Sequence, residues 1–170
     1  MSVPAIAGID SMVLIYAGIV PVKKTSTVAP ELSLRAKLLL HMLRDSIVIL
    51  PTIAVSELLV PVPAAKKGVL VAELQTRFLC PQFDIQAAAI AADLWAKHRK
   101  LPKDSQYKQR QVLRADSMII ATCKASGATV FYSHDSGCRD LANLVMKGHG
   151  LPKDDPTDMF IKNDIERGEA

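Results

Sequence analysis

Cysteine is scarce in this chain, and its pattern excludes two kinds of site. The 170 residues contain three cysteines, Cys80, Cys123 and Cys138, and no two of them form a C-x-x-C pair. An odd number without paired spacing argues against a disulfide framework and against a structural zinc site. We therefore interpret the three cysteines as small buried hydrophobes in a protein of the reducing cytoplasm.

The chain also lacks an uncharged apolar run long enough to cross a membrane. Its most apolar stretch near the start, residues 5–22, is interrupted by Asp10, Gly18 and Pro21. A charge in the middle of a membrane span is costly. The first residues carry no basic segment of the kind that begins a signal peptide. We therefore expect a cytoplasmic protein that does not associate with membranes.

Short motifs of several enzyme classes are absent as well. The sequence has no Walker A loop, no G-x-S-x-G elbow and no H-E-x-x-H helix, so nothing indicates a P-loop NTPase, an α/β-hydrolase or a zinc peptidase. What remains is a chain that is 49% hydrophobic, with a formal charge of +4 and a pI near 9.0. These values predict one folded domain and are compatible with a nucleic-acid partner without establishing one.

Short apolar runs alternate with longer helical patterns along the chain. Strands are predicted at about residues 5–9, 47–50, 78–80 and 128–132, and helices at about 30–44, 52–60, 64–77, 84–100, around Asp116, and 136–147. This alternation predicts an α/β fold whose parallel sheet carries helices on both faces. Residues 101–111 are expected to form a loop. We place the domain at residues 1–150, and residues 151–170 form a C-terminal tail that either completes the last strand or is disordered.

Four carboxylates lie at predicted strand ends or on helices expected to follow strands. They are Asp10 after the first strand, Glu57 on the helix after the second, Asp116 in a later helix, and Asp135 after the strand at 128–132. Ligands of open α/β sheets bind outside the carboxyl ends of the strands. Acids gathered there repel one another, and Mg²⁺ and Mn²⁺ prefer oxygen ligands. The pattern therefore predicts a divalent metal site.

Each acid also has a structural interpretation. Asp10 and Asp135 suit the N-cap positions of the helices that follow them, and Asp116 suits the first turn of a helix. Glu57 could be an ordinary solvated helix residue. These interpretations are separately plausible, but a metal site explains all four acids at one end of the sheet together.

The order and spacing of these segments resemble the PIN domain, a family of small metal-dependent ribonucleases. The resemblance covers about residues 5–146 and rests on Asp10–Ala17, Ser56–Leu58, Ala115–Ala121, Gly127–Thr129 and Ser133–Asp135. It implies a PIN-like three-layer α/β/α sandwich with a short, mostly parallel central sheet. It also implies that Asp10, Glu57, Asp116 and Asp135 are the catalytic metal ligands. Met12 departs from the family, which often has an Asn there.

Other polar residues are candidates for supporting roles. Ser11 and Ser133 stand beside the acids and could orient a carboxylate or a water molecule, although turn or cap hydroxyls are equally open. A basic strip, Lys97, His98, Arg99, Lys100, Lys103, Lys108, Arg110 and Arg114, is either a solvated surface or a phosphate track. In the second interpretation, Lys108, Arg110 and Arg114 contact the RNA backbone.

Together, the residues and the resemblance predict a Mg²⁺- or Mn²⁺-dependent endoribonuclease that hydrolyses RNA phosphodiester bonds. The resemblance further implies the toxin of a toxin–antitoxin module, of the VapC type, with a cognate antitoxin as partner and a homodimeric assembly. The alternative is a catalytically weak PIN-like RNA-binding or regulatory module, which Met12 would favour. A receiver-like phosphoacceptor domain is a third possibility, but it requires an acid pair after the first strand, where only Asp10 stands.

Overall fold

The computed structural model of the chain describes residues 3–20, 28–98 and 110–153, and in residues 110–112 it describes the backbone alone. The elements run in the order β1 (Ile6–Ile9), α1 (Ser11–Tyr16), α2 (Pro30–Met42), β2 (Ile47–Ile49), α3 (Thr52–Leu59), α4 (Ala64–Arg77), α5 (Ile85–His98), α6 (Arg110–Ala125), β3 (Val130–Tyr132), α7 (Ser136–Ala142) and β4 (Lys147–His149). None of these described helices is both long and apolar enough to cross a membrane.

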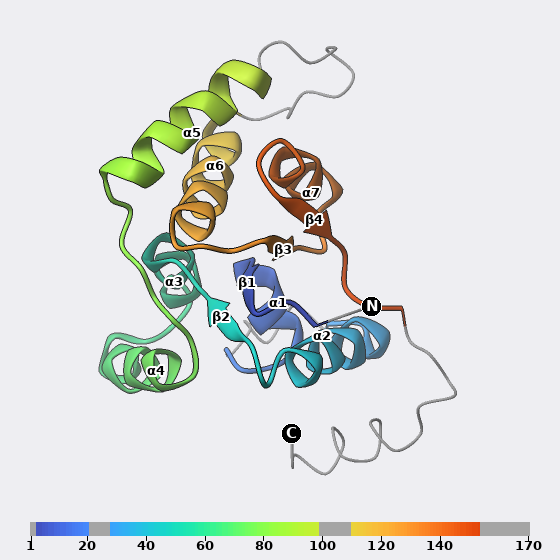
Figure 1. The fold of residues 1–170 in the computed structure, drawn as a ribbon. Helices are drawn as coiled ribbons and strands as arrows, with labels where there is room; N and C mark the ends of the chain where they lie inside the picture. The colour runs from blue at the N-terminus through green and yellow to red at the C-terminus, as the bar shows by residue number, and fades with distance from the viewer. Residues whose placement is uncertain (1–2, 21–27, 99–109, 154–170) are drawn as a thin grey trace.

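The strands form a parallel sheet in the order β2-β1-β3-β4. The predicted strand at residues 78–80 contributes one parallel bridge, between Leu79 and Ile49 at the β2 edge. In Figure 1, α6 and α7 lie on one side of the strands and α2 lies on the other, while α5 packs outside α6. The predicted α/β/α sandwich with a short parallel sheet is confirmed.

The register of the strands explains why two glycines stand in the sheet. Gly8 of β1 and Gly148 of β4 flank Phe131 of β3 on the face that α6 and α7 cover. A Cβ atom on Gly8 would lie 2.6 Å from the Cys123 Sγ of α6, and one on Gly148 would collide with the backbone of Arg139 in α7. The absence of side chains at these two positions therefore lets both helices approach the sheet closely.

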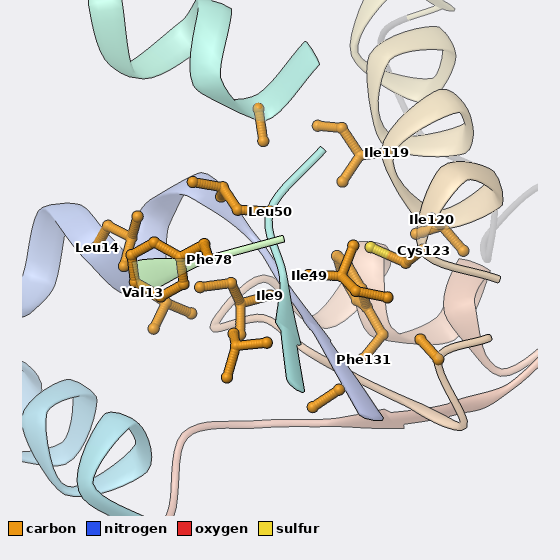
Figure 2. Packing of buried hydrophobic residues seen from close by; sticks show 14 of the residues in the cluster. Ile9, Val13, Leu14, Ile49, Leu50, Phe78, Ile119, Ile120, Cys123 and Phe131 are labelled. Atoms are coloured by element: carbon orange, nitrogen blue, oxygen red, sulfur yellow. The ribbon is translucent and has the colours of Figure 1, made fainter. Parts of the chain in front are cut away.

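The hydrophobic core fills the space between the sheet and the helices. Figure 2 shows Ile49, Phe131 and Cys123 converging from β2, β3 and α6, and all three are fully buried. Strands covered on both faces are expected to be largely apolar, as β1 and β2 are. Cys123 and Cys138 are buried free thiols and Cys80 is half-buried, so the interpretation of the cysteines as small core residues is confirmed for the first two.

Several helix boundaries follow from local chemistry. Pro30 occupies the first turn of α2, where its missing N–H costs no hydrogen bond. Asp84 precedes α5, and its Oδ1 accepts a hydrogen bond of 2.8 Å from the Ala87 amide. Gly127, with φ of +90°, reverses the chain between α6 and β3 in a conformation that glycine adopts most readily. The predicted cap at Asp84 is confirmed, and Gly127 ends the Asp116 helix as expected.

The end of the domain differs from the sequence-based prediction. The helix predicted at 136–147 ends at Ala142, and residues 147–149 form β4, a strand that the sequence analysis did not predict. The Asn143 side chain accepts a hydrogen bond of 2.8 Å from the Gly148 amide, which joins the end of α7 to the new strand. The strand was missed because Lys-Gly-His contains no β-branched residue, and its pairing with β3 decides its conformation.

Asp116 lies deeper in its helix than the sequence predicted. Helix α6 already begins at Arg110, within the segment expected to be a loop, and residues 101–109 lie outside the described part of the chain. Asp116 therefore lies in the middle of α6, and the interpretation as a first-turn acid is wrong. Nor does its helix follow a strand, because α6 comes after α5 and precedes β3.

Candidate functional site

Asp10 stands directly after β1, where its side chain is buried with 9% of the residue exposed. It occupies the N-cap position of α1, yet its carboxylate makes no capping hydrogen bond. Its Oδ2 instead accepts a hydrogen bond of 2.7 Å from Ser133 Oγ, and its Oδ1 lies 3.2 Å from Ser11 Oγ. The N-cap position alone does not explain this carboxylate, because besides the backbones of Ser11 and Met12 it contacts two serine hydroxyls.

Ser11 brings a second carboxylate to Asp10. The Ser11 hydroxyl lies 2.9 Å from Glu57 Oε2 and 3.2 Å from Asp10 Oδ1. A serine hydroxyl has one hydrogen, so it can donate to only one of these oxygens at a time. The other carboxylate oxygen then faces a hydroxyl lone pair. The Asp10–Ser11–Glu57 group therefore carries negative charge that this hydroxyl alone does not satisfy.

Burial works against the charged forms of both acids. It raises the pKa of Asp10 above its usual value, and the hydrogen bonds from Ser133 and Ser11 oppose this effect. The pKa of Glu57 is also raised, first by partial burial and further by the negative charge of Asp10, while the Ser11 hydrogen bond lowers it. Two neighbouring carboxylates whose charged forms are both disfavoured are a site for a proton or for a cation.

Asp135, after β3, has a different environment. It is exposed, and its Oδ1 accepts a hydrogen bond of 2.8 Å from the Cys138 amide as the N-cap of α7. Its own amide donates to Ser133 Oγ at 3.1 Å, so Ser133 connects the Asp135 backbone to the Asp10 carboxylate. The capping interpretation of Asp135 is thus confirmed.

Asp116 reaches the same region from α6. Burial raises the pKa of the Cys138 thiol, and the negative charges of Asp10, Asp116 and Asp135 raise it further. The negative charges of three acids, from the end of β1, from α6 and from the end of β3, therefore all act on one buried thiol. The Asp116 side chain is partly buried and belongs to this group through its charge.

The rim of the site contains residues that sequence reasoning did not assign. The rings of Tyr16 and His134 meet edge to face, with centroids 5.5 Å apart, and His134 is exposed. The negative charges of Asp10 and Asp135 add to the effect of burial in raising the pKa of Tyr16. Arg139 of α7 donates to the backbone oxygens of Ser133 and His134 at 3.1 and 2.6 Å. Its position four residues after Asp135 was the only sequence signal for this role.

The donor chemistry of the four acids fits a hard divalent cation, because all of them offer carboxylate oxygens. Within the described ranges, however, no three His, Cys, Asp or Glu side chains lie close enough together to hold an ion. The shared Ser11 hydroxyl joins only Asp10 and Glu57. The four acids thus have the donor atoms of a metal site, but they do not lie close enough together to coordinate one ion.

Of the three expected RNA-binding residues, only Arg114 has a described side chain, and it points away from Asp116. Arg114 is exposed, and its guanidinium stacks over the Trp95 ring of α5, 4.8 Å from the centroid. Residues two apart on a helix point about 200° away from each other, so Arg114 and Asp116 use different faces of α6. Lys108 and the Arg110 side chain lie outside the described residues. His98 is buried and so does not belong to an exposed strip.

Comparison with known proteins places this geometry in a family. The PIN domain model matches residues 25–144, a range that includes Glu57, Asp116 and Asp135 and begins after Asp10. Among solved structures, a chain of VapBC2 from Rickettsia felis, bound to a DNA fragment from their promoter, is similar with a TM-score of 0.55 and 12% identity. The likeness covers 86% of this chain and 99% of that one, and at this identity it shows the fold. No curated protein matches the sequence.

Proposed function

The chain belongs to the PIN domain family, and on this premise we propose that it is a metal-dependent endoribonuclease that hydrolyses RNA phosphodiester bonds. PIN domains are generally nucleases, and the acidic end of the sheet supports the same chemistry here. The observation that carries the proposal is the Asp10–Ser11–Glu57 group, in which one hydroxyl hydrogen lies between two carboxylates. A divalent cation would neutralise this charge and bring a phosphate to the acids.

Asp10, Glu57, Asp116 and Asp135 would hold one or two Mg²⁺ or Mn²⁺ ions. When bound, such an ion supplies Lewis acidity to the phosphate and lowers the pKa of water. Ser11 and Ser133 fix the orientation of the Asp10 carboxylate through their hydrogen bonds. Glu57, which is partly buried but still reaches solvent, can accept a hydrogen bond from the attacking water. Arg139 holds the turn that carries Asp135 by bonding the carbonyls of Ser133 and His134.

We further propose that the protein acts as the toxin of a toxin–antitoxin module. The likeness to a VapBC2 chain supports this assignment, together with the motifs of the PIN resemblance. A cognate antitoxin is then a partner, a homodimer is the expected assembly and the cytoplasm the expected location. Light scattering over a broad concentration range, with and without the antitoxin encoded nearby, tests the assembly. A monomer under all conditions would contradict it.

Cleavage of RNA under single-turnover conditions tests the enzymatic part. We expect the purified full chain to cleave single-stranded or structured RNA in Mg²⁺ or Mn²⁺ and not in EDTA. Asp116→Asn removes a ligand charge with little change in shape, so the rate should fall by orders of magnitude. Asp93→Asn, which alters an exposed acid of α5, is the matched control and should cleave at the wild-type rate. Equal cleavage in EDTA and in Mg²⁺ would contradict the mechanism.

A catalytically weak RNA-binding module is the second candidate. It is favoured because, among the described residues, no three ligating side chains lie close enough together to hold an ion. The two candidates separate in one experiment. If the protein binds RNA in a filter assay but leaves it intact in both Mg²⁺ and Mn²⁺, the second candidate replaces the first.

A further inference from the structure

The described residues leave a groove on one face of the sheet, beside β3 and β4. Val130 and Tyr132 of β3 pair in register with Lys147 and His149 of β4, so these four side chains share the face opposite α6 and α7. With Met42 at the end of α2, they line a groove of about 540 Å³. Parallel strands are ordinarily covered on both faces. Within the part of the chain that the structure describes, this face is therefore covered incompletely beside β4.

The walls of the groove include exposed apolar side chains. Val3 and Met42 both line it, and they are 52% and 39% exposed. Large apolar side chains grouped at a groove favour a covering segment, because burying them removes apolar surface from water. The cation of Lys147 and the ring of His149 add a basic edge, and no acidic residue among those described lines the groove.

The C-terminal part of the chain starts at this groove. Pro152 lines it, and Arg35 of α2 fixes the exit by donating to the carbonyls of Leu151 and Pro152 at 2.9 and 2.7 Å. Residues 154–170 follow directly. The effective concentration of this segment at the groove is therefore high, because it is tethered at the rim.

The chemistry of residues 154–170 complements the groove. The segment contains Met159, Phe160, Ile161 and Ile165. Its acids outnumber its bases, with Asp154, Asp155, Asp158, Asp164, Glu166 and Glu169 against Lys162 and Arg167. The other undescribed segment near α2, residues 21–27, carries Lys23 and Lys24 and no acid, so its charge has the same sign as the groove.

We propose that residues 154–170 dock in this groove and supply the layer that covers β3 and β4. Phe160 and Ile161 contact the apolar walls near Met42 and Tyr132, and the acidic residues lie beside Lys147 and His149. The folded domain then extends beyond residue 150. This inference does not depend on the proposed nuclease activity, and it concerns the sheet face opposite α6.

Photocrosslinking of the full chain tests the docking. Benzoylphenylalanine placed at position 42 should form a link to a peptide within residues 154–170, at the mass of a monomer. The same probe at position 85, where Ile85 is 84% exposed at the start of α5, is the matched control and should not link to the tail. A link to a second copy at the mass of a dimer, or the absence of any link to residues 154–170, would overturn the proposal.

Tail variants of the same full chain sharpen the test. Phe160→Asp with Ile161→Asp should abolish the link from position 42, whereas Lys162→Ala should keep it. Hydrogen exchange provides the second measurement. Amides of β4 should exchange at least about 10-fold faster in the double variant, because removing the cover opens the edge strand, while those of α5 should not change. Unchanged exchange in β4 would count against the docking.

Discussion

Asp10 and Asp135 follow neighbouring strands of the same sheet, yet their carboxylates have opposite surroundings. Asp10 is buried, makes no capping bond and shares two serine hydroxyls with its neighbours. Asp135 is exposed, and one of its oxygens begins α7 by bonding the Cys138 amide. Position at a strand end therefore does not by itself decide what an acid does. The exposed acid accepts a capping bond from a backbone amide, whereas the buried acid is held by serine hydroxyls.

The largest difference between the two acids is expected in catalysis. Asp10→Asn should lower the single-turnover rate of RNA cleavage in Mg²⁺ by orders of magnitude, because it removes the charge at the centre of the site. Asp135→Asn should lower it less, since Asn remains a good cap and Asp135 stands at the rim. Circular dichroism should show that both variants are folded. A larger loss for Asp135→Asn than for Asp10→Asn would reverse the assignment of roles.

Stability should show the opposite order. Asp135→Ala removes the cap of α7, and the free energy of unfolding should fall by about 1 kcal/mol. Asp10→Asn keeps its hydrogen-bond acceptor for Ser133 and loses a charge that burial disfavours, so it should not lower stability. Urea titrations of the two variants and the wild type give this comparison. Equal losses for both variants would show that Asp10 is also a structural residue.

The raised pKa of Asp10 predicts the direction of a pH effect. An acid whose pKa is higher in the folded than in the unfolded state contributes stability that is full below the unfolded pKa and lost as pH rises through the folded one. The usual value for Asp is 3.8. In EDTA, Asp10→Asn should therefore melt at a higher temperature than the wild type at neutral pH, and the difference should shrink toward pH ~4. A difference that grows on acidification would mean that the pKa is lowered instead.

The smallest effect is expected on the basic side of α6. Replacing Arg110 and Arg114 with Ala should weaken RNA binding about equally for different sequences and reduce the salt slope by roughly one for each phosphate that is no longer neutralised. Lys124→Ala, at an exposed position near the other end of α6, is the matched control. Filter binding across a salt series measures both quantities. An unchanged slope would show that Arg114 only stacks on Trp95.

The parts of the fold that local chemistry determines could be predicted from the sequence. Helix α4 was placed at residues 64–77, and Asp84 was identified as the cap of α5. Strand β4 could not be predicted, because its conformation depends on pairing with β3 and on the bond from Gly148 to Asn143. The start of α6 was missed because polar residues around Arg110 resemble a loop when no packing partner is known.

The candidate site could likewise be predicted only in part from the sequence. The order of the four acids and the two serines indicated which residues approach the strand ends. Only the structure shows that Ser11 contacts both Asp10 and Glu57, since these residues are distant in sequence. The contact of Arg114 with the Trp95 ring depends on the packing of α6 against α5, which the sequence did not show. That a divalent metal binds here, and that the four acids come together to coordinate it, stay predictions.

Binding of Mn²⁺ to the full chain tests most directly whether Asp10 and Glu57 carry a charge that a divalent cation neutralises. The measurement is a titration of Mn²⁺ into the metal-free protein, followed by calorimetry and by thermal melting. We expect Mn²⁺ to bind the wild type and Asp93→Asn, and to raise their melting temperatures by mass action. Asp10→Asn should show neither effect. A response of Asp10→Asn equal to that of the wild type, or no response from the wild type, would contradict the account.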